Sequence, residues 1–364
     1  MTSSGLYESF LSLVRLGIDH SVSSLPDAIE WEPIYTLSIE QRLSAIVLDG
    51  AQKLADNCAL SKGRAMDASL KKNWIATVIQ NYEWEYENYR KQIGQLARFY
   101  NEHSFRMMVL KGYGLSLDYP IPQHRPCGDI DIWLFGRYKE ADAALSREIS
   151  IPVNTSHHHH TVFTFNDYPV ENHYDFVNVH YGHGNAALEK VFKELAMDDS
   201  VRTEIDGQTV YLPSANLHAL FVLRHTMLHF ASTRMRIRQI LDWGFLVEKH
   251  SSEIDWTWLL RILDEYHMTS FFHCLNAICV QDLGFDLSLF PTIQVDTEMK
   301  DRVLNDVFSP EFNEEAPRFF LKRIYYKYRR WQGNAWKHDL CYGDSRFKSF
   351  WLGVWGHLMK PGMI

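Results

Sequence analysis

Two aspartates separated by one residue form the stretch of this chain best suited to chemistry. Asp129 and Asp131 alternate with Ile130 and Ile132 directly after Gly128. On a β-strand, residues i and i+2 point to the same face, so both carboxylates would project together while the isoleucines face a core. Two like charges that close together repel unless a cation lies between them. Carboxylate oxygens suit Mg²⁺, which in proteins usually accompanies substrate phosphates. An edge strand with alternating solvated acids is the alternative.

A glycine-containing turn precedes the aspartates. Residues 107–110 predict a buried strand, and Lys111, Gly112, Tyr113 and Gly114 follow it. Glycines in a turn between a strand and a helix allow backbone N–H groups to approach a phosphate closely, and a lysine adds a positive charge. We therefore expect this turn to bind the phosphates of a nucleotide, with a plain turn as the alternative.

A proline-rich loop, residues 119–127, connects the turn to the aspartates. Arg125 in this loop lies four residues before Asp129. A guanidinium group matches phosphate geometry through two parallel hydrogen bonds, so Arg125 could neutralise charge on a leaving pyrophosphate. An ion pair with Asp129 or with a surface carboxylate explains the same arginine equally well.

A hairpin pattern downstream supplies a third carboxylate. Residues 161–176 are rich in strand formers and are interrupted by turn residues at 166–168. Glu171 is the natural third acid, delivered from a neighbouring strand, and Asp175 and Asn178 are alternatives further along. Three acids around two Mg²⁺ ions suit an in-line nucleotidyl transfer, in which one metal activates the attacking oxygen and the other holds the triphosphate.

These motifs resemble the polymerase-beta-type nucleotidyltransferase superfamily, and more closely a bacterial family of uncharacterised nucleotidyltransferases. The shared motifs are a Lys-Gly turn, a Tyr-Pro…Arg loop, a Gly-Asp-x-Asp strand and a Glu-x-His strand, here Lys111-Gly112, Tyr119-Pro120 with Arg125, Gly128 to Asp131, and Glu171 to His173. The match covers about residues 105–180. The resemblance implies a mixed sheet flanked by helices, bound Mg²⁺ and an NTP donor. Gly112-Tyr113 stands where better-known members have Gly-Ser, which keeps a catalytically inactive nucleotide-binding regulator open as an alternative.

The composition is that of an ordinary globular protein. The 364 residues are 46% hydrophobic and 23% charged, enough for two or three subdomains with their own cores. Five dispersed cysteines, no signal-peptide pattern and no apolar run of about 20 residues lead us to expect a cytoplasmic protein without a membrane span. The net charge of −8 argues against a protein coated in nucleic acid.

The pattern of elements predicts an α+β fold with three regions. We expect a polymerase-beta-type core with a mixed β-sheet over residues 105–212, between a helical region at 1–104 and a second helical region at 213–364. Residues 68–104 carry apolar side chains every three to four positions, which predicts a long amphipathic helix. A second hairpin is expected to turn at residues 206–207.

Three clusters allow more than one interpretation. His157 to His160 could face the phosphates, transfer protons or bind metal, or could simply begin a partly exposed strand. His225 and His229 share a helix face and could bind a metal, although packed or hydrogen-bonded core histidines explain the spacing better. The three arginines of residues 234–238 could line a nucleotide pocket or form a solvated basic helix.

The favoured hypothesis is Mg²⁺-dependent transfer of a nucleotide to a hydroxyl of a small molecule or protein. Asp129, Asp131 and Glu171 would be both catalytic and metal-binding residues. An RNA- or tRNA-directed transferase toxin is a further alternative, because basic and aromatic residues alternate over residues 318–331. That pattern suits a nucleic acid or a membrane surface, and it is also common in ordinary amphipathic helices.

Overall fold

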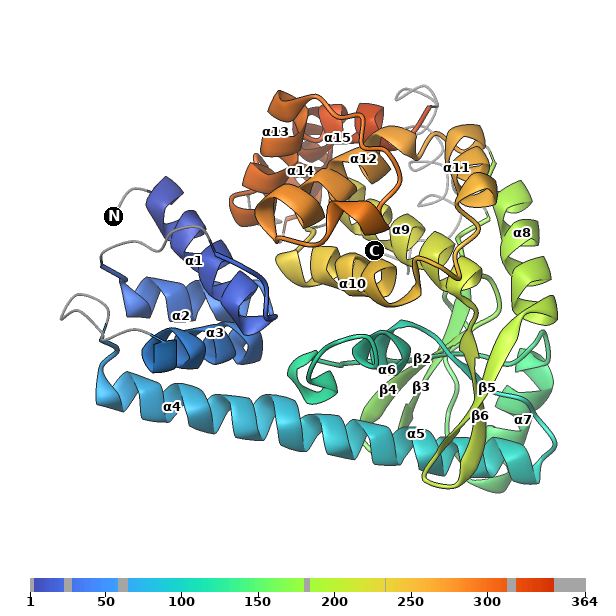
Figure 1. The fold of residues 1–364 in the computed structure, drawn as a ribbon. Coiled ribbons are helices and arrows are strands. Elements are labelled where there is room, and N and C mark those ends of the chain that lie inside the picture. The colour runs from blue at the N-terminus through green and yellow to red at the C-terminus, as the bar shows by residue number, and fades with distance from the viewer. Residues whose placement is uncertain are drawn as a thin grey trace.

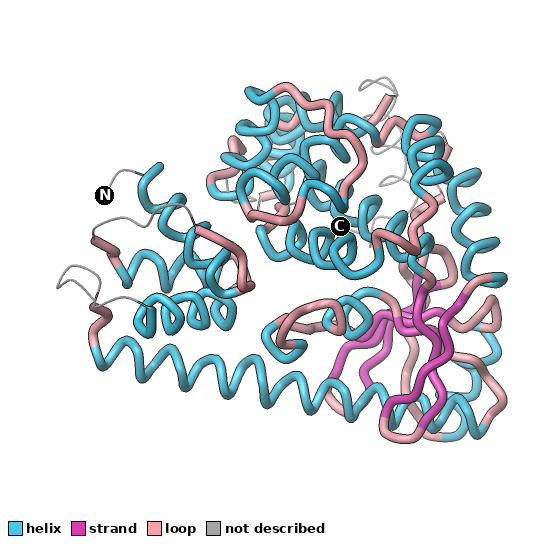
Figure 2. The backbone as a smooth tube through the Cα atoms, in the orientation of Figure 1, coloured by secondary structure: helices cyan, strands magenta, loops and turns pink. Residues whose placement is uncertain are grey.

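A six-stranded sheet lies among helices that precede and follow it in the sequence (Figure 1). The computed structural model describes residues 3–22, 28–57, 65–179, 184–232, 234–312 and 319–343. The strands gather in one part of the molecule, and the remaining elements are helices (Figure 2). The expected α+β class is confirmed.

The chain before the sheet is helical. Its elements are α1 (Ser3–Gly17), α2 (Trp31–Glu40), α3 (Ser44–Asn57), α4 (Ala68–Val78), the π-helical segment η1 (Ile79–Trp84) and α5 (Glu85–Glu102). The last three follow one another without a break, so the long helix predicted over residues 68–104 is confirmed. Figure 1 shows this helix running from the N-terminal helices to a position beneath the sheet.

The sheet is mixed. Its strands are β1 (Met108–Val109), β2 (Ile130–Trp133), β3 (His160–Phe165), β4 (Tyr168–His173), β5 (Ser200–Ile205) and β6 (Gln208–Pro213). They are arranged in the order β3-β4-β2-β1-β6-β5, with β2 parallel to β4 and antiparallel to β1. Both predicted hairpins are confirmed, because β3 pairs with β4 and β5 pairs with β6, each antiparallel.

Shorter helices connect the strands, and a larger helical layer follows them. The connecting elements are α6 (Lys111–Ser116), η2 (Pro122–His124), α7 (Tyr138–Glu148) and α8 (Asn185–Asp198). The C-terminal elements are α9 (Ala215–Ser232), α10 (Ile237–His250), α11 (Trp256–Glu265), α12 (Thr269–Ala277), η3 (Ile278–Asp282), η4 (Leu287–Leu289), α13 (Thr297–Phe308), α14 (Phe320–Gly333) and α15 (Ala335–Cys341). Figure 1 shows α9 and α10 on the opposite side of the sheet from α5.

Alternation along the central strands separates an apolar face from a polar face. Ile130 and Ile132 of β2 are fully buried and pack with Ile93 of α5 in the core beneath the sheet. Helix α5 falls in the predicted N-terminal region, yet it closes the core of the sheet. The opposite face carries Asp131 and Glu171, so the pattern of Asp-Ile pairs in the sequence translates directly into two faces.

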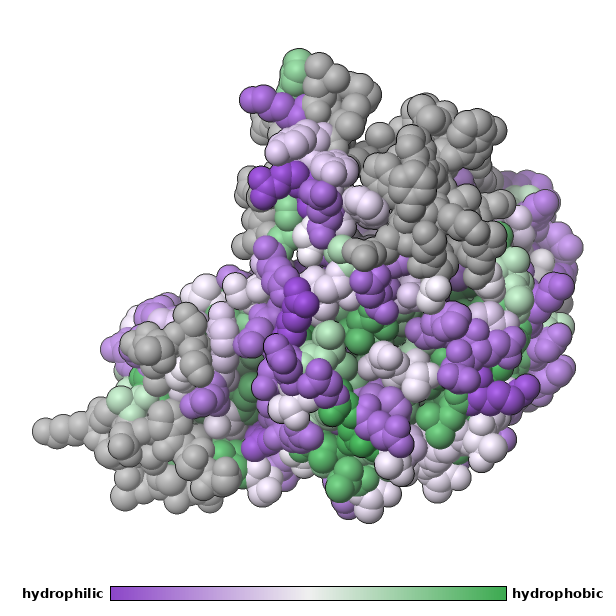
Figure 3. Space-filling view, turned by 90° about the horizontal axis from the view of Figure 1, so that it is seen from above, coloured by the Kyte–Doolittle hydropathy of each residue, from purple (hydrophilic) through white to green (hydrophobic). Residues whose placement is uncertain are grey.

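The N-terminal helices also contact the C-terminal helical layer. The ring of Tyr7 stacks on Phe308, with 4.3 Å between ring centroids. Seen from above, hydrophilic residues cover much of the described surface, with smaller apolar areas between them (Figure 3). None of the described helices combines the length and the apolar character needed to cross a membrane.

Candidate active site

Asp131 and Glu171 lie side by side on neighbouring parallel strands. The register of the sheet pairs Asp131 of β2 with Glu171 of β4, so both side chains project from the same face. That face borders a cleft of about 1270 Å³, which α9 and α10 also line and which we call the central cleft. Asp131, Glu171 and His173 each place one ligand atom within 4.8 Å of the others. The structure thus brings together carboxylates that are 40 residues apart in the sequence.

Asp129 lies one residue before β2 and also lines the central cleft. Its side chain is more exposed than that of Asp131, and among the described residues the 4.8 Å group does not include it. Desolvation inside the cleft, together with the charge of Asp131, raises the pKa of Asp129. The hydroxyl of Tyr89 donates a hydrogen bond of 3.0 Å to the Asp129 carbonyl oxygen, which ties the start of the strand to α5.

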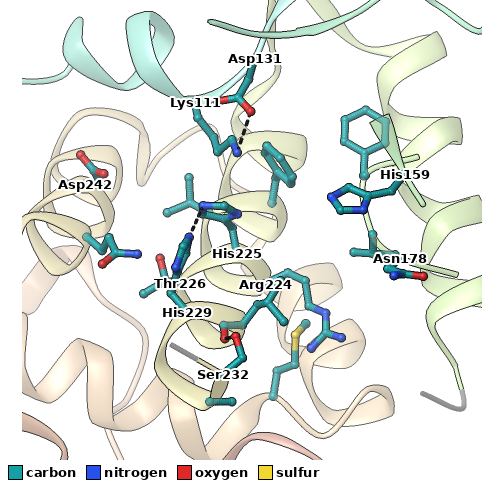
Figure 4. Close-up of a pocket in the computed structure, with 18 of the residues that line it drawn as sticks. Lys111, Asp131, His159, Asn178, Arg224, His225, Thr226, His229, Ser232 and Asp242 are labelled. Carbon is teal, nitrogen blue, oxygen red and sulfur yellow. Dashed lines mark hydrogen bonds and ion pairs between the residues drawn. The ribbon is translucent and has the colours of Figure 1, made fainter. Parts of the chain in front are cut away.

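Asp131 is held between a lysine and a histidine. Lys111 Nζ lies 2.8 Å and His173 Nε2 lies 3.0 Å from Asp131 Oδ1. Burial on its own would raise the pKa of Asp131, but the lysine and the histidine outweigh it and lower that pKa. Burial would likewise lower the pKa of Lys111 and of His173, but Asp131 and the neighbouring Glu171 together outweigh it, with Asp129 adding to the effect on Lys111, so that both pKa values are raised. Figure 4 shows Lys111 and Asp131 joined across one end of the cleft.

The turn at Lys111 and Gly112 leaves no room for a side chain on Gly112. Lys111 has a φ of 31°, and Gly112 has a φ of 14° with a ψ of −95°. A Cβ atom on Gly112 would lie 2.3 Å from the hydroxyl oxygen of Tyr89, so no larger residue fits without displacing that ring. Both turn residues line the central cleft.

The next two residues of the predicted phosphate turn pack elsewhere. Tyr113 is buried beneath the sheet, where its ring stacks with Tyr86 at 6.2 Å between centroids. Gly114 lies against α9, where a Cβ atom would come within 3.5 Å of His218. Tyr113 and Gly114 are not among the residues that line the cleft.

Arg125 forms a buried ion pair with Asp242 of α10. Its Nε lies 2.7 Å from Asp242 Oδ1 and its Nη2 lies 3.0 Å from Oδ2, while Tyr119 donates to the same carboxylate at 2.7 Å. The Nη1 of Arg125 donates to the carbonyl oxygen of Gly112 at 2.9 Å. The arginine therefore ties α10 to the phosphate turn. It lines the cleft, but its donors are already engaged by protein groups.

Histidines surround the carboxylates on two sides. His160 begins β3 directly opposite His173, and His159 precedes it on the cleft wall. Burial lowers the pKa of His159 to about 3 and that of His160 to about 4. On the facing helix α9, the Nε2 atoms of His225 and His229 lie 3.0 Å apart, as the dashed line in Figure 4 shows. The hydrogen-bonded pair expected from their spacing is confirmed.

The remaining predicted clusters divide between the cleft and the surface. Arg236 and Arg238 line the cleft. Of the basic and aromatic stretch, Arg318 lies outside the described residues, while Tyr325 and Tyr328 on α14 are 61% and 43% exposed. These tyrosines do not pack inward as they would in an ordinary amphipathic helix.

The sequence matches a known family over more than half of its length. Residues 27–284 match the family of uncharacterised nucleotidyltransferases. The chain belongs to this family. No match to a curated protein was found. Family membership implies a nucleotide substrate.

Two solved structures align with part of this chain. The solution structure of the antibiotic-resistance factor ANT(2'')-Ia aligns with a TM-score of 0.37 and 12% identity, over 51% of this chain and 97% of that chain. The crystal structure of an antigenic nucleotidyltransferase-like protein from Paracoccidioides brasiliensis aligns with a TM-score of 0.32 and 14% identity, over 44% of this chain and 75% of that chain.

No role at the site was predicted for His173 from the sequence, yet the structure places it beside the carboxylates. It follows Glu171 by two positions on β4, so both side chains lie on the carboxylate face, and its Nε2 is 3.5 Å from Glu171 Oε2. The Glu-x-His spacing carried the signal, since alternate strand residues share a face. Of the alternative acids, Asp175 instead forms an ion pair with Lys193 of α8.

Proposed function

We propose that this protein is a Mg²⁺-dependent nucleotidyltransferase that moves an NMP from an NTP to a hydroxyl group. The observation that carries the proposal is the pairing of Asp131 with Glu171 on parallel strands at the edge of the central cleft. The chain that carries this pair belongs to a nucleotidyltransferase family. Two acids brought together in this way fit the arrangement that in-line transfer at a phosphate needs.

The donor set fits a divalent cation. Asp131 and Glu171 supply hard carboxylate oxygens, His173 adds a nitrogen within the same 4.8 Å group, and Asp129 lines the same cleft. We propose that the three acids hold Mg²⁺. When bound, the metal would neutralise the triphosphate and polarise its reacting phosphate.

The protein's own groups would position the nucleotide. Lys111 lies beside the acids with its side chain 12% exposed, so its ammonium group is placed to reach the triphosphate once a cation neutralises Asp131. Arg125 is a positioning residue in this account, because it holds the Gly112 carbonyl and so orients the turn rather than contacting pyrophosphate itself.

We propose that Glu171 accepts the proton of the acceptor hydroxyl. Burial is the largest effect and would raise its pKa, but the hydrogen bond with His173 and the charges of His160 and His173 together lower the pKa, so the carboxylate is ionised at neutral pH. An ionised carboxylate within reach of the acceptor serves as a general base.

The size of the cleft favours a second substrate beside the nucleotide. Its volume of about 1270 Å³ exceeds the roughly 300–1,000 Å³ of ordinary ligand pockets. The lining continues from the acids past Arg224 to Tyr266 and Tyr342, well beyond the phosphate turn. We propose a small molecule or a protein side chain as the acceptor, in keeping with the net charge of −8.

Label transfer tests the proposal. Each α-³²P NTP is incubated with Mg²⁺, a cell lysate and either the wild type, Asp131→Asn or the control Glu140→Gln, whose side chain is 63% exposed on α7. We expect label in an acceptor with the wild type and the control, and none with Asp131→Asn. Equal labelling by Asp131→Asn would refute the assignment. Tight NTP binding without labelling in any mixture would favour the inactive regulator.

A further inference from the structure

Three histidines form a compact group at the corner of the carboxylate site. His159, His160 and His173 each place one ring nitrogen within 4.8 Å of the nitrogens offered by the other two. The ring centroids lie 4.3 Å apart for His159 and His160, and 5.3 Å apart for His160 and His173. The sheet creates this group, because β3 and β4 are antiparallel and place His160 directly opposite His173.

Two of the three histidines each have one ring nitrogen that the protein leaves unsatisfied. His160 is 7% exposed and His173 is 3% exposed. The Nδ1 atoms of His159 and His160 are buried without a hydrogen-bond partner. Buried polar side-chain atoms in folded proteins nearly always have a partner, and an unsatisfied cluster calls for a bound ion or another explanation.

We propose that His159, His160 and His173 form a binding site for a transition-metal cation of the Zn²⁺ class. Imidazole nitrogens suit Zn²⁺ and its neighbours, whereas Mg²⁺ prefers an octahedron of oxygens. Zn–N bonds of about 2.0–2.1 Å place tetrahedral ligand nitrogens about 3.4 Å apart. The observed group lies within 4.8 Å, so small side-chain rotations complete the site.

The acids beside the histidines complete the environment of such a cation. His160 Nε2 lies 3.8 Å from Glu171 Oε1, and His173 Nε2 lies 3.0 Å from Asp131. A carboxylate next to a metal-bound histidine orients the ring and raises its affinity for the metal. His173 belongs both to this group and to the group with Asp131 and Glu171, so the two candidate metal sites lie next to each other and have one residue in common.

Equilibrium dialysis with Zn²⁺ tests the site. The full chain is prepared without a histidine tag, stripped with a chelator and dialysed against Zn²⁺ in the presence of millimolar Mg²⁺. We expect the wild type to retain about one Zn²⁺ per chain, and His159→Asn and His160→Asn each to weaken binding at least about ten-fold. His157→Asn is the matched control, since its exposed ring belongs to the same run but not to the group. It should bind within about two-fold of the wild type.

Three results would overturn the proposal. They are no Zn²⁺ retained by the wild type, wild-type affinity in both His159→Asn and His160→Asn, and loss of Zn²⁺ only in His229→Asn, which would place the metal on the α9 pair. If His160→Asn unfolds by circular dichroism, the half-exposed His159→Asn decides the matter. Because nucleotide is absent throughout, failure here is distinguishable from failure of nucleotidyl transfer.

Discussion

The ion pair between Arg125 and Asp242 makes the sharpest prediction about stability. The two side chains are only 3% and 6% exposed, and the guanidinium contacts both carboxylate oxygens. Asp242→Asn keeps the size of the side chain and removes its charge. Arg125 would then be left buried with its charge uncompensated, and Arg238, which lies 3.8 Å from Asp242, would lose the same partner.

The expected decrease in the free energy of unfolding follows from the cost of leaving one buried charge without a partner. Breaking such a pair by removing one partner typically costs about 3–5 kcal/mol. The amide of Asn can still accept one hydrogen bond from Tyr119 or Arg125, so we expect the lower end, about 3 kcal/mol. The exposed pair Arg137–Glu140 is the control, because its side chains are 48% and 63% exposed. Glu140→Gln should cost at most about 1 kcal/mol.

Urea unfolding followed by circular dichroism measures both variants, provided that the slopes of the transitions agree. The double variant Arg125→Met with Asp242→Leu should recover part of the loss, since a hydrophobic pair of similar volume carries no buried charge. A cost for Asp242→Asn no larger than that for Glu140→Gln would refute the reasoning, because it would mean that the buried charge is not held by this pair.

Three further predictions concern the nucleotide, the pH dependence and the surface of α14. Lys111→Met should weaken NTP binding by about 1.5–3 kcal/mol, the usual worth of a hydrogen bond to a charged group, and unchanged affinity by calorimetry would contradict its placement at the phosphates. Burial lowers the pKa of His218 to about 4, below the value of about 6.5 in the unfolded chain. The stability that the neutral His218 side chain contributes is therefore fully present above about pH 6.5 and is lost as the pH falls towards about 4. In urea unfolding over this pH range, the wild type should lose up to about 1.4 kcal/mol more of its free energy of unfolding per pH unit than His218→Leu. The same pH dependence of that free energy in both proteins would count against the prediction. If the exposed tyrosines of α14 accompany an RNA-binding surface, charge reversal at Arg329 and Arg330 should weaken salt-dependent RNA binding in a filter assay, and unaffected binding would remove that alternative.

Local pattern predicted the parts of the fold that depend on neighbours in the sequence. The alternation around Asp131 placed the isoleucines in a core and the acid in a cleft, and the turn residues at Asn166-Asp167 located a hairpin. Both residues of that turn have positive φ values, which Asn and Asp tolerate better than most residues. Such features are decided within a few residues, so one sequence is enough to find them.

Partners that are distant in the sequence could not be predicted. Arg125 and Asp242 are 117 residues apart, and nothing in their spacing distinguishes that pair from a contact with phosphate. Tyr113 lies in the core and not at the cleft, and its ring packs on Tyr86 of α5. That helix was expected to belong to another region. His173 joins Asp131 only because β2 and β4 are neighbours in the sheet, which the sequence alone does not specify.

A paired-label experiment tests whether nucleotidyl transfer takes place at Asp131 and Glu171. The acceptor fraction found by labelling is incubated with Mg²⁺ and the same NTP carrying either an α-³²P or a γ-³²P label, using the wild type and Glu171→Gln. We expect the α-label to enter the acceptor and the γ-label to leave as pyrophosphate with the wild type, and neither to occur at a detectable rate with Glu171→Gln. Transfer of the γ-label to the acceptor, or a wild-type rate in Glu171→Gln, would contradict this expectation.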